Sequence, residues 1–196
     1  MEFQNKRIAR YVGQRITYLL ERRDQSDGRA ALAELRRGIG HAPGDLPELW
    51  GLFLSGLPED MLSTGGDPTR EEWAVYLSMT MFALHQQGKD APMHRTGESI
   101  GAAAAELIES KDDMERVWRR FSTVVSRSDI SGIAYHLRSF IQLLKASGVS
   151  LDYESLAADL YLLQHPESAS RVKLRWGQDF FSAYDKRFLK KEDNND

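Results

Sequence analysis

The sequence contains no cysteine, no apolar run of membrane-spanning length and only six prolines. Without cysteine, disulfide bonds and thiolate-bound metal sites are excluded, and a reducing compartment is the natural setting. The first twenty residues carry four cations and lack the apolar centre of a signal peptide. We therefore expect a cytoplasmic protein that does not bind a membrane.

Motifs that carry catalysis are also missing. The segment Gly88-Lys89-Asp90 has neither the glycine spacing nor the following Ser or Thr of a Walker-type phosphate loop, and there is no HExxH motif. The five histidines stand apart, without the spacing of metal ligands. Pairs of carboxylates such as Asp112 and Asp113 fall at predicted helix starts, where the helix dipole accounts for them. The sequence predicts a protein that is not an enzyme, with no cofactor, no metal site and no small-molecule substrate.

What the chain does have is helical periodicity over most of its 196 residues. Residues 38–68, which hold four prolines and seven glycines, are expected to form an irregular connection. Thr69 with Glu72, and Ser110 with Asp113, have the spacing of capping boxes. The apolar spacing predicts helices over residues 3–24, 29–37, 69–87, 99–109, 114–127, 130–146, 152–163 and 170–189.

These elements predict an all-α fold, either one compact helical bundle or two small helical lobes. The boundary between the lobes is placed at residue 110, which gives an N-terminal helical lobe at 1–110 and a C-terminal helical lobe at 111–191. The acidic tail at 192–196 is expected to fray.

The net charge of −3 conceals a strong segregation along the chain. Residues 1–38 carry a net charge of +4, residues 39–115 carry −10, and residues 116–191 carry +6. The basic N-terminal segment and the basic C-terminal half could share one positive face, with the acidic middle turned elsewhere. The alternative is that this segregation disappears in three dimensions.

Cations recur at helical spacing on three predicted helices and in the closing segment. Cations neutralise phosphates, and neighbouring aromatic rings can stack on bases. The alternative for each stripe is a solvated face whose arginines lie over apolar side chains. No predicted helix has the features of a base-reading recognition helix, so binding that follows the backbone fits better. The stripes are Arg7, Tyr11, Arg15, Tyr18 and Arg22; Arg116, Arg120 and Arg127; Tyr135, Arg138, Gln142 and Lys145; and Arg171, Lys173 and Arg175, which precede Trp176.

Several stretches, taken in order over residues 30–181, resemble one family. The sequence is similar to CasB, the small subunit of the type I-E CRISPR Cascade surveillance complex. The N-terminal helix and the loop at residues 88–97 match less clearly. The matching stretches are Ala30-Ala31-Leu32-Ala33-Glu34-Leu35-Arg36-Arg37-Gly38 with Trp50 downstream; Arg120-Phe121; His136-Leu137-Arg138 with the helix through Leu144-Lys145; Leu151-Asp152-Tyr153 followed by Leu156 and Asp159-Leu160; and Arg171 to Phe181.

The resemblance implies an all-helical, non-catalytic subunit that helps to hold the target and displaced strands of an R-loop. It implies as partners the other Cascade subunits and their crRNA, single-stranded and R-loop DNA, and a second copy of the chain within the complex. Two alternatives stay open. One is a structural adaptor whose basic faces dock acidic partner surfaces, and the other is a stand-alone helical protein that binds nucleic acid without sequence preference.

The family-like motifs and the cationic faces together select the candidate site. We assign Trp50 and Trp176 to the hydrophobic core rather than to base stacking. The nucleic-acid-binding residues that we predict are Arg37, Arg116, Arg120, Arg127, Arg138, Lys145, Arg171, Lys173 and Arg175.

Overall fold

The computed structural model describes residues 2–127 and 129–188. In these ranges it has helices, one isolated β-bridge between His94 and Leu151, and no strand, which confirms the predicted all-α fold. The predicted tail at 192–196 lies outside the described residues. The elements are α1 (Glu2–Glu21), α2 (Ser26–Arg37), η1 (Pro47–Leu49), α3 (Trp50–Phe53), η2 (Glu59–Met61), α4 (Arg70–Gln86), α5 (Ile100–Glu106), η3 (Lys111–Asp113), α6 (Met114–Val125), α7 (Ile130–Ser147), α8 (Tyr153–Leu163) and α9 (Pro166–Phe188).

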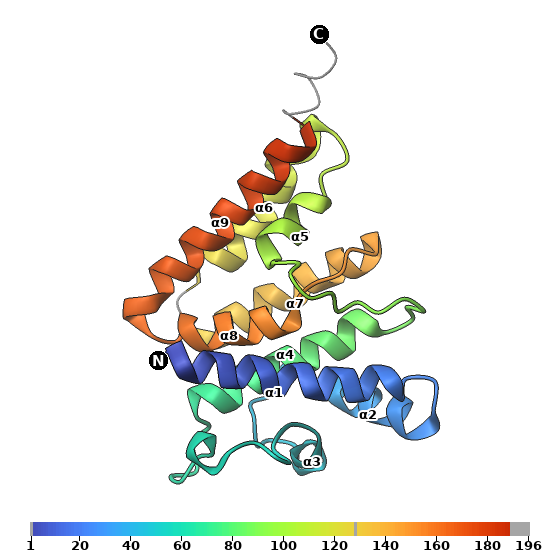
Figure 1. Cartoon of the computed structure of the whole chain (residues 1–196), viewed down its shortest axis with the longest axis vertical. Coiled ribbons are helices and arrows are strands. Elements are labelled where there is room, and N and C mark those ends of the chain that lie inside the picture. Colours follow the sequence, from blue (N-terminus) through green and yellow to red (C-terminus); the bar gives the residue numbers. More distant parts are fainter. Residues whose placement is uncertain (1, 128, 189–196) are drawn as a thin grey trace.

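Helix α4 is the centre of the lower part of the molecule in Figure 1, where α1, α2, α7 and α8 pack around it. Residues 74–86 are all buried, as expected for a helix that is apolar around most of its circumference. The predicted capping box at its start is confirmed: the Glu72 N–H donates to the Thr69 hydroxyl, and the Thr69 N–H donates to the Glu72 carboxylate. This central helix holds α7 in place beside the end of α2.

Helices α5, α6 and α9 form the upper part of the molecule (Figure 1). Val172, Trp176 and Phe180 bury one stripe of α9, at the four-residue spacing of a helix face. Helix α5 comes very close to this stripe at Gly101, where an added Cβ would lie 2.2 Å from the carbonyl oxygen of Trp176. Helix α5 precedes residue 110 and α9 follows it, so this contact crosses the predicted lobe boundary. The division into lobes stays a prediction.

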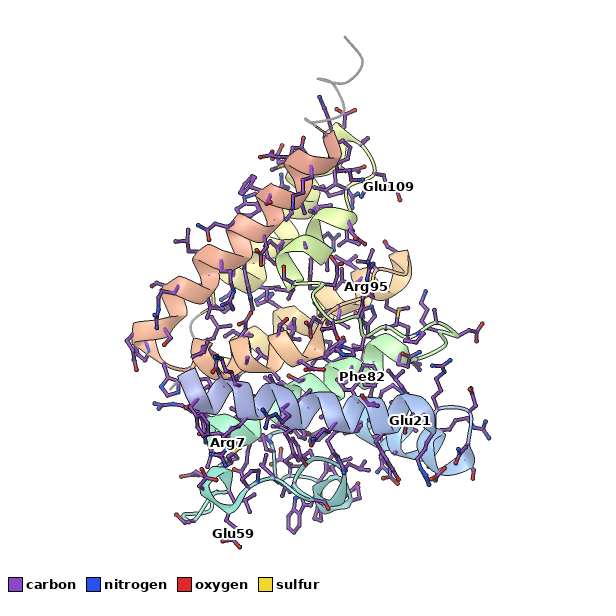
Figure 2. The ribbon with its side chains drawn as sticks, viewed as in Figure 1. Arg7, Glu21, Glu59, Phe82, Arg95 and Glu109 are labelled. Carbon is purple, nitrogen blue, oxygen red and sulfur yellow. The ribbon has the colours of Figure 1, made fainter. Side chains whose placement is uncertain are left out.

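The irregular connection between α2 and α4 is held by side chains from α1. Arg7 pairs with Asp60 at 2.6 Å, and the Tyr11 hydroxyl lies 3.0 Å from the carbonyl oxygen of Phe53. Arg15 donates to the carbonyl oxygen of Leu52 at 2.8 Å. Figure 2 shows Arg7 on the side of α1 that faces this connection. These members of the predicted α1 stripe therefore stabilise the fold, and they do not form an open cationic face.

The two tryptophans assigned to the core have different positions. Trp176 is 1% exposed, so its assignment is confirmed. The assignment of Trp50 is wrong, because its side chain is 46% exposed. Trp50 opens the four-residue helix α3, which turns Phe53 inward and leaves Trp50 at the surface.

Candidate nucleic-acid interface

Three of the predicted site residues already have acidic partners within the fold. Arg37 lies 3.3 Å from Glu48, and Arg116 lies 2.7 Å from Asp113. Arg175 pairs with the buried carboxylate of Asp159. Their charges are partly neutralised before any ligand arrives, so they are weaker candidates for phosphate contacts than unpaired cations.

Arg175 has a clear structural role through Asp159. The second carboxylate oxygen of Asp159 accepts a hydrogen bond of 2.6 Å from the indole N–H of Trp176. Burial raises the pKa of Asp159, while the charge of Arg175 and these hydrogen bonds act in the opposite direction. Together these groups join α8 to α9 and fix the rotation of α9 about its axis.

Because α9 is a helix here, its three cations do not lie on one face. Arg171 and Arg175 are four residues apart and share a side, whereas Lys173 projects about 200° away from Arg171. A guanidinium nitrogen of Arg171 lies 3.5 Å from the Ser168 hydroxyl, at the outer limit of a hydrogen bond. The alternation of cations and apolar residues in the sequence would give one cationic face only in a strand.

Other predicted residues are open to solvent. Arg120, Arg127 and Arg138 are exposed, and none has an ion pair or a side-chain hydrogen bond with another described residue. Lys173, which is half-buried, also lacks such a partner among residues 2–127 and 129–188. These cations are the ones that a polyanion could contact without first breaking an internal ion pair.

Arg120 and Arg138 open onto opposite flanks of α7. Arg120 lines a cavity of about 210 Å³ with Phe140 and Leu143, and Arg116 lines the same cavity. Arg138 lines a larger cleft of about 410 Å³ with residues 131, 134 and 135. The α7 positions in these two linings fall on different sides of the helix. The structure therefore provides two cationic surfaces rather than one groove shared by Arg120 and Arg138.

The second surface, which we call the α7 outer face, consists of Tyr135, Arg138, Gln142 and Lys145. These residues follow one side of the helix, as predicted, and the first three are exposed. Lys145 is half-buried, and its ammonium group donates a 2.9 Å hydrogen bond to the side-chain oxygen of Gln87.

Two further cations approach Lys145 from other elements. Burial lowers the pKa of Lys145, and the positive charges of Arg36 and Lys89 lower it further. Arg36 comes from the last turn of α2 and Lys89 from the loop after α4. Both line a cavity of about 290 Å³ that also contains Asp24 and Asp90.

Other kinds of site are not found in the described part of the chain. Among residues 2–127 and 129–188, no group of three or more His, Asp or Glu side chains could hold a metal ion. No helix in these ranges is long and apolar enough to cross a membrane.

The comparisons with known proteins identify the family. The family model described as CRISPR-associated protein Cse2 matches residues 31–181. The chain belongs to the Cse2 family. The match has nearly the same bounds as the predicted resemblance to CasB, which is confirmed. No curated protein matches the sequence.

Solved structures share the fold of this Cse2-family chain. CasB from Thermobifida fusca is 31% identical and superposes with a TM-score of 0.75, over 89% of this chain and 97% of that one. A chain of a CRISPR RNA-guided surveillance complex is 20% identical, with a TM-score of 0.74, over 94% and 99% of the two chains. CasB from M. ruber is also 20% identical, with a TM-score of 0.65, over 92% and 97%.

Sequence reasoning missed two residues of the cationic surface on this Cse2-family fold. In the sequence, Lys89 stands in a segment that lacks the phosphate-loop spacing, and Arg36 is not among the predicted site residues. Both are distant in sequence from Lys145, so no periodicity within one helix could have grouped them. The family-like stretch that ends at Gly38 was the available signal for Arg36.

Proposed function

We propose that this chain is a non-catalytic small subunit of a crRNA-guided surveillance complex. In this proposal it binds single-stranded nucleic acid through the α7 outer face and so stabilises the target and displaced strands of an R-loop. Membership of the Cse2 family supports the first part, as does the fold shared with a chain of such a complex. Its partners would be the other subunits, the crRNA and a second copy of the chain.

The observation that carries the binding role is the convergence of cations on the α7 outer face. Arg138 is exposed and unpaired among the described residues, and Lys145 is bonded to Gln87, which lines a cavity with Arg36 and Lys89. Such an arrangement neutralises phosphates without reading bases. This is sufficient in a guided complex, because pairing with the guide reads the sequence and the protein follows the backbone.

The cations on the other flank of α7 would form a second track. Arg120 and Arg127 are exposed and unpaired among the described residues, and Arg116 lies beside Arg120 in the same cavity. An R-loop has two separated strands, and two surfaces on opposite flanks of α7 would keep them apart. Arg37, Arg171, Lys173 and Arg175 would add secondary phosphate contacts, with Arg175 serving first to hold Asp159.

The test is the lifetime of the R-loop on a reconstituted complex. We expect Arg120→Glu combined with Arg138→Glu to shorten this lifetime, because each change replaces an attraction for phosphate with a repulsion. Arg119→Glu is the matched control, since Arg119 is already paired with Glu115 at 2.7 Å. An unchanged R-loop lifetime in the double variant, with the complex fully assembled, would refute the binding role. Loss of assembly instead would indicate a structural adaptor.

A further inference from the structure

We propose that the cleft beside Arg138 binds one unstacked nucleobase of the single strand that follows the α7 outer face. This inference rests on the proposed function and adds to it a contact with a base rather than a phosphate. The cleft lies between the segment after α2, helix α4 and helix α7, and has a volume of about 410 Å³. That volume falls within the range of about 300–1,000 Å³ that is typical of small-molecule sites.

The walls of the cleft suit a flat aromatic ligand. Leu77 and Met81 are buried and provide an apolar floor, and the half-buried ring of Trp73 also lines the cleft. Besides Tyr135 and Arg138, the polar side chains of the lining are His41, Thr80, whose hydroxyl donates to the carbonyl oxygen of Tyr76, and Ser131, whose hydroxyl has no hydrogen bond to a described residue. Apolar walls with a small number of polar groups are what an orienting pocket for a base requires.

Tyr135 is the strongest sign that this ligand is a base. Its ring is 72% exposed, although it lines the cleft and belongs to a helix whose apolar side chains are otherwise mostly buried. The ring contact closest to it is with the neighbouring His136, at 5.1 Å between centroids. An exposed ring at the edge of an apolar cleft offers a stacking surface that accepts any of the four bases.

Arg138 provides the charge that a nucleotide ligand would need. It lies one helical turn from Tyr135 on the same side of α7, so the two side chains are neighbours. Its guanidinium has no ion pair or hydrogen bond with another described residue. An aromatic platform beside an unpaired cation matches a base and its phosphate, and it fits an apolar peptide segment less well.

The test compares two single-stranded DNA oligomers of equal length and equal phosphate number. One carries thymine at every position and the other is abasic. We expect the full chain to bind the thymine oligomer between about 5-fold and about 140-fold more tightly, which is the range for stacking one base on an aromatic side chain. Tyr135→Ala should lose most of this difference and leave the affinity for the abasic oligomer unchanged. Phe3→Ala is the matched control, because Phe3 is an aromatic residue on α1 that is 74% exposed and lies outside the cleft.

A second measurement maps the contact directly. The wild-type chain is irradiated with a single-stranded oligomer that contains 5-iododeoxyuridine, and the cross-linked peptide is sequenced by mass spectrometry. Cross-links at Tyr135 or Trp73 support the base-binding cleft, and cross-links confined to other elements would overturn it.

The outcomes separate this inference from the proposed function. Equal affinity of the wild-type chain for the two oligomers would overturn base binding and leave the phosphate contacts standing. If neither oligomer bound at low salt, the proposed function and this inference would both fail. If Tyr135→Ala kept full affinity for thymine but lost assembly with partner subunits, the cleft would be a protein-docking site and the inference would be wrong.

Discussion

Neutralising two cations of the α7 outer face should flatten the salt dependence of single-strand binding. We choose Arg138→Gln combined with Lys145→Gln, because Arg138 is unpaired among the described residues and Lys145 is bonded only to a neutral amide. Each phosphate contact on a single strand adds about 0.7 to the slope of log K against log salt concentration. Loss of two contacts should therefore lower the slope by about 1.4.

The slope translates into an affinity change that is simple to measure. Between about 50 and 200 mM salt, a slope difference of about 1.4 means that the wild-type chain loses roughly sevenfold more affinity than the double variant. The assay is fluorescence anisotropy with a labelled single-stranded oligomer over a salt series. Arg119→Gln is the control for one lost charge, since Arg119 is paired with Glu115 and should leave the slope unchanged. A double variant that binds more weakly with the slope of the wild type would refute the assignment of these cations to phosphates.

Four further substitutions test the scaffold, and urea unfolding followed by tryptophan fluorescence measures the effect of each. Gly101→Ala should lower the free energy of unfolding by about 1–3 kcal/mol, because its Cβ would lie 2.2 Å from the Trp176 carbonyl oxygen. Gly177→Ala, which has open space around its Cβ, should instead stabilise α9 by up to about 1 kcal/mol, and a loss in both variants would contradict the reasoning. Asp159→Ala should lower the free energy of unfolding by about 1–3 kcal/mol, because the buried Trp176 N–H loses its acceptor. An unchanged free energy of unfolding would mean that this hydrogen bond does not stabilise the fold. Burial lowers the pKa of His85 to about 4 from its ordinary value of 6.5, so the unfolded chain binds more protons below pH 6.5. The stability linked to neutral His85 is therefore present above pH 6.5 and lost as the pH falls toward 4. Between pH 7 and pH 5, the free energy of unfolding should fall by about 2 kcal/mol more in the wild-type chain than in His85→Gln. The same pH dependence in both proteins would mean that another group is responsible for the loss.

The helices were predictable because their signals are local. Apolar spacing located every long helix, and the capping boxes at Thr69 and Ser110 are both present in the structure. Trp50 was placed wrongly because a four-residue helix spans barely one turn, so no apolar spacing repeats from which a buried side could be read. Lys89 was missed for a different reason: its approach to Lys145 depends on how α4 packs against α7, which no single segment encodes.

The partners of the cations were the feature that the sequence predicted least well. Arg15 of α1 has backbone acceptors, whereas Arg138 of α7 has none among the described residues, and backbone hydrogen bonding explains part of this difference. An irregular segment leaves carbonyl oxygens without helical partners, and buried carbonyl groups need donors. The connection between α2 and α4 is such a segment, and Arg15 and Tyr11 of α1 donate to it. Helix α7 packs mainly on α4 and α6. Arg138 lines the cleft beside residues 38–42 at the start of the same connection, but its guanidinium has no hydrogen bond to a described residue. A stripe of arginines that donates to the carbonyl oxygens of an irregular connection is therefore a weaker sign of nucleic-acid binding than a stripe whose arginines have no acceptor among the described residues.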